Sequence, residues 1–422
     1  MKFKKQTLKN GLRIIMVPRP ESIATNVLVL AETGSKYESE KQRGLSHFLE
    51  HMFFKGTERR PKSADISTEL DGLGAEYNAY TSQEFTGYYA TVQPKLALRA
   101  LDIIADMYLH STFPAAEIAK ESGVIVEEIN MYEDMPQRHV QDLFLSLLYG
   151  DTPAGRPIIG TKASVRSFKR DDFTNYRRHH YVAAATVVIV AGHFDEAKML
   201  KNIKQQFADI PTTVNSPKVV VKEKQQKPAA LVKFKQSDQT HLVLGFRAFS
   251  ARHKQSEATD LLAAVLGGGM SSRLFQKIRD ELGAAYYVRA YNDGYTDHGF
   301  LQVAVGTDNK RVKEIIKAIL AEARKLKTTL VPRSELERVK ESVIGHLFLG
   351  LERSSSLAGF YGAEEIIKGQ LLTPEAAARR LRAVTARQLK AVAQKVFTNR
   401  GLNLALIGPF KDKSAFVPSL HL

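Results

Sequence analysis

The segment His47-Phe48-Leu49-Glu50-His51 carries the strongest structural signal in this chain. On a helix, residues four apart lie on one face, so His47 and His51 can offer both imidazoles to a single metal ion. Glu50 follows His47 by three residues on the same side, where its carboxylate can reach a water molecule at that metal. The H-x-x-E-H order therefore predicts a zinc-hydrolase site on a helix. The competing interpretation is an amphipathic helix with two ordinary histidines.

A third ligand decides between these interpretations. Catalytic zinc sites use three protein ligands and leave the fourth position to water, and the chain contains no cysteine. Residues 114–133, PAAEIAKESGVIVEEINMYE, show a helical pattern with a proline and an acidic residue near its start. Glu121 and Glu128 are two turns apart and share a face, whereas Glu127 is rotated by about 100°. We therefore predict Glu128 as the third ligand and Glu121 as its supporting carboxylate.

Three segments of the first half together resemble a known family of metallopeptidases. They read HFLEHMFFKGT, GAEYNAYTSQEFTGYYATV and ESGVIVEEINMYED, at residues 47–57, 74–92 and 121–134. The chain resembles the pitrilysin/insulinase family, whose H-x-x-E-H members are the inverzincins. The nearest branch is that of short subunits, which includes the bacterial processing-type peptidases and the mitochondrial processing peptidase β subunit. The similarity extends from about Lys5 to about Pro409.

This resemblance implies a role for each residue of the motif. Zinc would be held by His47, His51 and Glu128. Glu50 would act as the general base, and Glu121 as a helper carboxylate beside the ligands. All five residue types match the family pattern. The sequence therefore indicates an active zinc endopeptidase rather than a non-catalytic family member built into a larger complex.

Residues 266–287, LGGGMSSRLFQKIRDELGAAYY, resemble the family segment whose arginine and tyrosine bind the substrate backbone. Arg279 and Tyr286 match those two positions. A guanidinium and a phenol can donate hydrogen bonds to a peptide carbonyl or to its developing oxyanion. Without the resemblance, an arginine and a tyrosine at this spacing would be interpreted as surface and packing residues.

Two further features are expected to contact substrate. The triplet Gly267-Gly268-Gly269 lacks the phosphate-loop pattern G-x-x-x-x-G-K-[ST], so we expect a turn near the substrate path. By resemblance, Asn78 and Ala79 lie at a strand edge where an extended peptide adds as a further strand. Taken from the residues alone, Asn78 is equally well explained as a turn residue.

The chain is predicted to hold two similar α+β domains in tandem. Residues 211–228, PTTVNSPKVVVKEKQQKP, contain three prolines and several lysines and are predicted to form a linker. This division gives a zinc-binding domain over residues 1–210 and a metal-free domain over residues 229–422. A faint repeat supports it, because GYYATV and a helix at 94–110 correspond to GFLQVAV and a helix at 309–327.

Two domains are half of the four-domain clamshell that long family members form from one chain. We therefore expect two chains to close one chamber around unstructured peptides or presequences. Because the zinc motif and the Arg279/Tyr286 pair are both present, a homodimer is favoured. In it, the His47 site of one subunit would face Arg279 and Tyr286 of the other. A heterodimer with a separate, partner-dependent subunit is the alternative.

Composition limits the remaining possibilities. The 422 residues carry a formal net charge of +16, almost all of it in the second half, which would suit acidic peptides. A basic nucleic-acid-binding protein is the rival class, but no nucleic-acid-binding motif accompanies the charge. No apolar run is long enough for a membrane span. The basic N-terminus lacks the apolar core of a secretory signal, so a cytoplasmic location is expected.

Overall fold

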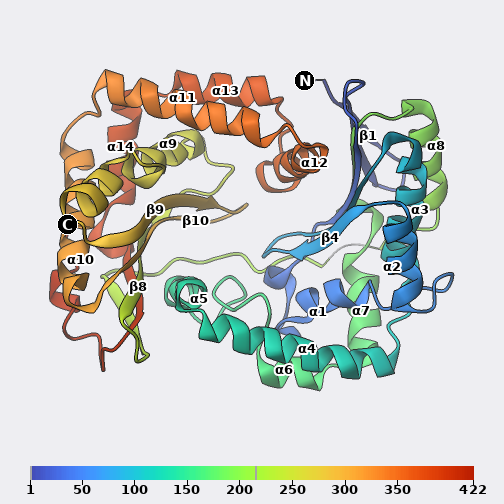
Figure 1. Cartoon of the computed structure of the whole chain (residues 1–422), viewed down its shortest axis with the longest axis horizontal. Helices are drawn as coiled ribbons and strands as arrows, with labels where there is room; N and C mark the ends of the chain where they lie inside the picture. Colours follow the sequence, from blue (N-terminus) through green and yellow to red (C-terminus); the bar gives the residue numbers. More distant parts are fainter. Residues whose placement is uncertain (1, 214–215) are drawn as a thin grey trace. The chain divides into compact units, whose positions relative to one another are not determined.

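The computed structural model describes residues 2–213 and 216–422, which form two compact units (Figure 1). Unit 1 contains the segments 2–130, 156–213, 216–219 and 348–373. Unit 2 contains the segments 131–155, 220–347 and 374–422. Each unit has its own β-sheet and its own helices, which confirms the predicted α+β class.

The sheet of unit 1 has six strands in the order β1-β2-β6-β3-β5-β4. In that order the strands span Lys4–Thr7, Arg13–Pro18, Thr186–Gly192, Thr25–Ala31, Thr86–Val92 and Glu76–Thr81. The central strands β3 and β6 are buried at every position, because their sequences TNVLVLA and TVVIVAG are runs of apolar and β-branched residues. The strand β4 lies at an edge and, among the described strands, pairs with β5 alone.

The sheet of unit 2 has five strands in the order β7-β11-β8-β10-β9. They span Ala229–Phe234, Leu402–Gly408, Gln239–Ala248, Gly299–Asp308 and Ala285–Gly294. In both sheets a single parallel pair, β2/β6 or β7/β11, is followed by antiparallel neighbours. The topology therefore confirms the internal repeat: β10 corresponds to β5, and the edge strand β9 corresponds to β4.

Helices cover both sheets. Those of unit 1 are α1 (Leu45–Met52), α2 (Ser63–Gly72), α3 (Ala97–His110), α6 (Lys162–Ser167), α7 (Arg170–His180), α8 (Glu196–Gln206) and α12 (Ser354–Ala363). Those of unit 2 are α5 (Pro136–Tyr149), α9 (Ser256–Gly267), α10 (Val312–Thr328), α13 (Pro374–Ala383) and α14 (Ala386–Val396). The long helices α4 (Ala115–Asp134) and α11 (Arg333–Gly350) each begin in one unit and end in the other.

The two halves of the sequence exchange one helix each. Helix α5 comes from the first half but packs on β8 and β11 of unit 2. Helix α12 comes from the second half but packs on β3 and β6 of unit 1. The compact units therefore differ from the expected contiguous domains 1–210 and 229–422 in these two segments. The helices α5 and α12 each pack against strands that come from the other half of the sequence.

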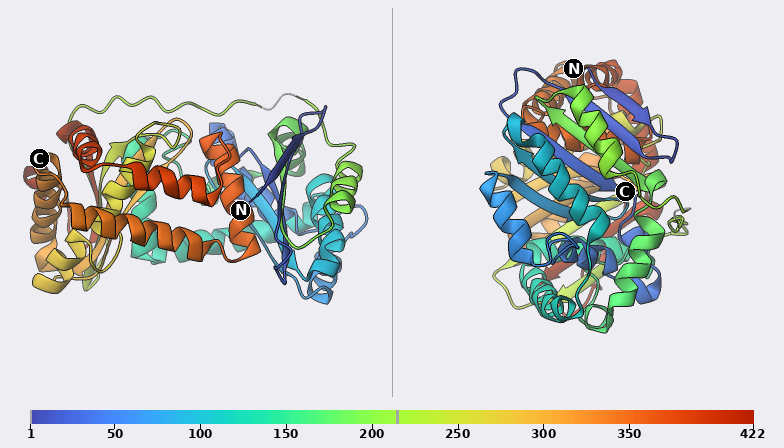
Figure 2. Two further views of the ribbon diagram at one scale, coloured as in Figure 1. Left: turned by 90° about the horizontal axis from the view of Figure 1, so that it is seen from above. Right: turned by 90° about the vertical axis from the view of Figure 1, so that its right-hand side faces the viewer.

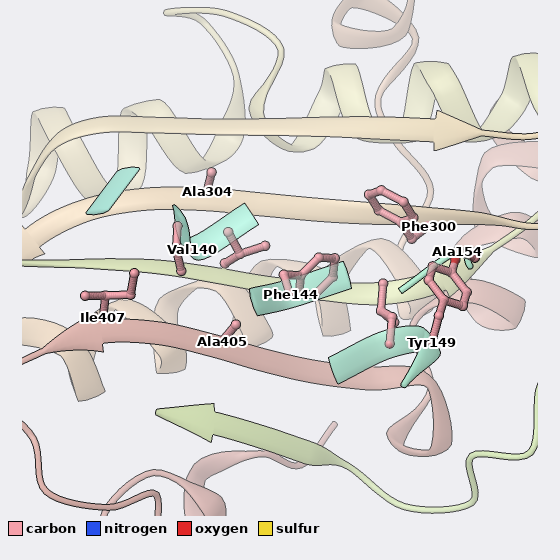
Figure 3. Packing of buried hydrophobic residues seen from close by; sticks show 10 residues of the cluster. Val140, Phe144, Tyr149, Ala154, Phe300, Ala304, Ala405 and Ile407 are labelled. Atoms are coloured by element: carbon pink, nitrogen blue, oxygen red, sulfur yellow. The ribbon is translucent and has the colours of Figure 1, made fainter. Parts of the chain in front are cut away.

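The core around α5 shows why the exchange is stable. Phe144 and Val140 of α5 are fully buried against Val243 of β8, with Phe300 and Ala405 from the neighbouring strands (Figure 3). A Cβ atom at Gly245 would lie 2.4 Å from Cζ of Phe144, so only glycine lets this ring reach the sheet. Burying such a ring contributes about 2 kcal/mol through the hydrophobic effect.

The predicted linker, residues 211–228, contains the boundary between the units, which falls after Val219. Its residues 216–228 form an extended trace without helix or strand (Figure 2), and residues 214 and 215 lie outside the described part of the chain. Lys218 is attached to unit 1 by an ion pair with Glu84, with 3.1 Å between Nζ and Oε1. Among the described residues, no helix is long and apolar enough to cross a membrane.

Candidate metal centre

Helix α1 presents the predicted motif because its two faces differ. Leu45, Phe48, Leu49 and Met52 are fully buried on one side, and this apolar stripe fixes the helix against the interior. The motif residues His47, Glu50 and His51 are only partly buried on the other side. The helix begins after Gly44, whose φ of +88° is a conformation that glycine adopts without strain.

The three predicted ligands converge. The Nε2 atoms of His47 and of His51 each lie 3.8 Å from Oε2 of Glu128, which projects from α4. One potential ligand atom from each residue lies within 4.8 Å of the others. Two imidazole nitrogens and one carboxylate oxygen are the donor set of catalytic zinc sites with three protein ligands. The residues therefore fit zinc, and the spacing argument chose the glutamate that faces the histidines.

The predicted supporting carboxylate, Glu121, holds the ring of His51. The Nδ1–H of His51 donates a hydrogen bond to Glu121 Oε1 at 2.9 Å. This tautomer leaves Nε2 unprotonated, with its lone pair available to a metal ion. The ammonium of Lys55 lies 2.6 Å from the other oxygen of Glu121. Burial acts to raise the pKa of Glu121, but the hydrogen bonds from His51 and Lys55 outweigh it, and the pKa is lowered. Glu121 is therefore ionised at neutral pH.

His47 is held differently. Burial, together with the neighbouring His51, lowers the pKa of the His47 imidazole to about 3, so the ring is neutral and able to bind metal. Its Nδ1 atom is buried and has no hydrogen-bond partner among the residues that the structure describes. Within the described part of the chain, a carboxylate therefore orients the ring of His51 but not that of His47.

Glu50 is held by the end of strand β4. The hydroxyl of Thr81 donates a hydrogen bond to Glu50 Oε2 at 2.5 Å. Burial raises the pKa of Glu50, and the bond from Thr81 acts in the opposite direction. A carboxylate with a raised pKa is better suited to accept a proton near neutral pH.

The predicted substrate strand is an edge strand, as expected. Asn78 and Ala79 lie in the middle of β4, with Asn78 exposed and Ala79 buried. The side chain of Asn78 accepts the N–H of Ala79 at 2.8 Å, so a local bond already occupies this donor. Because β4 is the last strand of its sheet, its outer edge is the one at which an added strand would pair.

The predicted substrate-binding residues of the second half lie together in unit 2. Gly267, Gly268, Gly269, Arg279 and Tyr286 line one pocket of about 630 Å³. The guanidinium carbon of Arg279 lies 6.0 Å from the centre of the Tyr286 ring, and Tyr286 is 80% exposed. Position 267 requires glycine because the backbone of β9 lies close to it: a Cβ atom there would lie 2.6 Å from the backbone nitrogen of Ala290.

Sequence reasoning missed Lys55 and Thr81. Lys55 follows the end of α1, so helical spacing does not predict its contact with Glu121. Thr81 is brought to Glu50 by the packing of β4 on α1. The only signal for either residue was its position within the segments that resemble the family.

Comparison with known proteins agrees with this geometry. Residues 13–162 match the family described as Insulinase (Peptidase family M16), and residues 167–343 match the family described as Peptidase M16 inactive domain. The chain belongs to the insulinase family of peptidases. The candidate ligands His47, His51 and Glu128 fall within the first match, and Arg279 and Tyr286 fall within the second.

Members of the insulinase family that resemble this chain are named as zinc proteases. A Bacillus subtilis protein named as an uncharacterized zinc protease is 36% identical over 96% of this chain and 98% of its own length. A Streptomyces coelicolor protein named in the same way is 32% identical, over 98% and 91%. The crystal structure of a Helicobacter pylori protease has a TM-score of 0.91 at 24% identity, covering 97% of this chain and 99% of that one, which shows the shared fold.

Proposed function

We propose that this protein is a zinc-dependent endopeptidase that hydrolyses unstructured peptides. The observation that carries the proposal is the convergence of His47, His51 and Glu128 beside the carboxylate of Glu50. Three ligands leave a metal position open for water and substrate, as catalysis requires. The names of the related proteins support the same conclusion.

The roles of the side chains follow from their chemistry. Zinc bound by the three ligands would polarise a peptide carbonyl and acidify a water molecule. Glu50 takes the proton of the attacking water and then delivers it to the leaving amine. Thr81 keeps the Glu50 carboxylate in one orientation, and Lys55 keeps Glu121 ionised against the His51 ring.

Substrate recognition is proposed to rest mainly on the peptide backbone. An extended peptide would add to the free edge of β4 near Asn78 and Ala79, where main-chain hydrogen bonds supply affinity. Arg279 and Tyr286 would donate hydrogen bonds to the substrate carbonyl from the pocket of unit 2. We further propose that two chains associate, so that the pocket of one chain serves the zinc site of the other.

The test is hydrolysis of a mixed library of unstructured peptides by zinc-loaded protein, comparing wild type with Glu50→Gln. The substitution keeps the ligands and removes the base, so the variant should retain zinc and lose activity by several orders of magnitude. Glu127→Gln, an exposed carboxylate near the ligand set, is the matched control. Absence of cleavage by zinc-loaded wild type would contradict the proposal and point to a subunit that needs a separate partner.

A further inference from the structure

Glu38 is a buried carboxylate that the proposed reaction does not use. It is 4% exposed and follows the short 3-10 helix η1 (Ser35–Tyr37). Its Oε2 atom accepts the N–H of Gly44 at 2.8 Å, and its Oε1 atom accepts the N–H of Ser46 at 2.7 Å. Ser46 lies in the first turn of α1, and Gly44 is the residue directly before the helix. One side chain thus satisfies two donors that a helix leaves free at its start.

The helix cannot supply this cap itself. Serine, threonine, aspartate and asparagine are the usual residues before a helix, but Gly44 occupies that position with a φ of +88°. A Cβ atom at Gly44 would lie 2.6 Å from the carbonyl oxygen of Ile159, so a capping side chain does not fit there. The Glu38 carboxylate takes its place, and its negative charge faces the positive end of the helix dipole.

The segment that carries Glu38 is also fastened to the turn after β4. The N–H groups of Ser35 and Lys36 donate to the carbonyl oxygens of Ser82 and Gln83, at 3.2 and 2.9 Å. The ammonium of Lys36 pairs with the Glu84 carboxylate at 3.1 Å, and both side chains are completely buried. One short segment therefore holds this turn through its backbone and Lys36, and holds the start of α1 through Glu38.

The two elements that this segment holds, α1 and the turn after β4, are also joined by the hydrogen bond between Thr81 and Glu50. Glu50 lies on α1, whereas its hydrogen-bond donor Thr81 is the last residue of β4. The distance between them therefore depends on how the start of α1 is placed relative to the turn that begins at Ser82. A displacement of about 1 Å at a catalytic group can lower a rate by about a hundredfold.

We propose that Glu38 is a positioning residue of the peptidase site, whose ionised carboxylate fixes the start of α1 so that Glu50 meets Thr81. The hydrogen bonds described for the Glu38 carboxylate go to the backbone of Gly44 and Ser46, so Glu38 acts through the start of the helix. The inference rests on the proposed function, because it assigns Glu38 a part in that same reaction.

Protonation of Glu38 provides a way to test this role. Burial raises the pKa of Glu38 to about 7, while the N–H groups of Ser46 and Gly44 and the charge of Arg156 act to lower it. When pH falls through about 7, the carboxyl gains a proton and one oxygen loses its capacity as an acceptor. Besides Arg156, the titratable group shown to interact with Glu38 is Tyr176 of α7, whose pKa is raised by burial and by the charge of Glu38. Tyr37, the residue before Glu38, packs against His180 of α7, and Lys36 is paired with Glu84.

The first experiment measures kcat and KM against pH for zinc-loaded wild type, Glu38→Gln and the control Glu40→Gln. Glu40 is exposed and forms an ion pair with Arg43 across 3.3 Å. We expect Glu38→Gln to keep its zinc, to lower kcat about tenfold at mildly alkaline pH with little change in KM, and to lose the fall in kcat near pH 7. A Glu38→Gln enzyme with the kcat and pH profile of wild type would overturn the inference.

A second experiment needs no variant and no peptidase activity. Hydrogen exchange of the amides in α1 is measured in wild type above and below pH 7, after correction for the intrinsic exchange rate. Protection at Gly44 and Ser46 should fall at the lower pH, while that of the central strand β3 stays constant. Unchanged protection in α1 would overturn the inference, even if Glu38→Gln fails to fold. If wild type cleaves no peptide, the proposed function fails, and this measurement still decides whether Glu38 controls the helix.

Discussion

Thr81 and Glu50 are joined by a hydrogen bond of 2.5 Å, between Oγ1 of the threonine and Oε2 of the glutamate. The threonine ends the edge strand β4, and the glutamate lies within helix α1. The same hydroxyl also lies 3.5 Å from the carbonyl oxygen of Ser46, one turn earlier in the helix. The strand proposed to receive the peptide and the group proposed to activate water are thus linked by a single side chain.

Removal of this hydroxyl should reduce turnover without loss of metal. Thr81→Val keeps the branched shape but leaves Glu50 without its donor. A hydrogen bond to a charged group contributes about 1.5–3 kcal/mol, so kcat should fall by about 10- to 100-fold while zinc content stays the same. Steady-state kinetics and metal analysis check the two parts. Thr81→Ser retains the hydroxyl and should keep most of the activity; an equal loss in both variants would contradict the role given to the bond.

Neighbouring glutamates of α4 should differ sharply in their effect on zinc. Glu128 faces the two histidines, whereas Glu127 is exposed and accepts a hydrogen bond from Asn130 at 3.2 Å. Glu128→Gln should therefore lower zinc affinity by well over tenfold, and Glu127→Gln should leave it unchanged. Competition with a chromophoric chelator measures both affinities. Zinc loss in Glu127→Gln alone would show that the ligand set was assigned wrongly.

A mixed dimer tests whether the site is shared between chains. Glu50→Gln and Arg279→Ala chains, each poorly active alone, are co-expressed with different affinity tags and purified through both. If Arg279 serves the zinc site of the other chain, one site of each mixed dimer combines an intact Glu50 with an intact Arg279. About half of the wild-type activity should then return. If each chain uses its own Arg279, the mixed species should stay as inactive as its parents.

Asp293 of β9 should make unit 2 less stable as pH rises. Burial, with a smaller contribution from the neighbouring Asp260, raises the pKa of Asp293 to about 6 against the opposing hydrogen bond from Gln302. Between the ordinary value of 3.8 and about 6, the folded protein keeps a proton that the unfolded chain releases. Stability therefore falls with rising pH across this window.

The variant Asp293→Asn removes this effect. Its free energy of unfolding should exceed that of wild type by about 3 kcal/mol above pH 6, and the gain should shrink to about 0.5 kcal/mol near pH 4. Urea titrations at the two pH values measure it. Asp238→Asn, at an exposed position of the same unit, is the control. A gain that persists undiminished at the lower pH would show that the effect is unrelated to ionisation.

Local spacing in the sequence was sufficient to predict that the candidate ligands His47, His51 and Glu128 lie together. The positions of His47, Glu50 and His51 on one helix, and the choice of Glu128 over Glu127, follow from helical geometry alone. The repeat was visible because β5 and β10 have similar sequences and are followed by similar helices. These features depend on residues that are close in the chain, and helical periodicity describes such residues well.

Contacts between distant segments could not be predicted in this way. The amphipathic pattern of α5 shows that one face is buried, but it does not show which sheet covers that face. The contact of Lys55 with Glu121 and the cap that Glu38 provides for α1 likewise depend on packing. Which side chains meet in the interior depends on the complete fold, so the spacing of residues within one helix does not predict these contacts.

The exchange of α5 and α12 has a consequence for proteolysis. The chain passes between the two units five times, after residues 130, 155, 219, 347 and 373. A protease that cuts at the exposed Lys222 or Lys224 leaves an N-terminal fragment that still supplies α5 to unit 2, and a C-terminal fragment that still supplies α12 to unit 1. The nicked protein should therefore give two bands on a denaturing gel but one peak in gel filtration. A single cut in the linker would break the chain while leaving the fold in one piece.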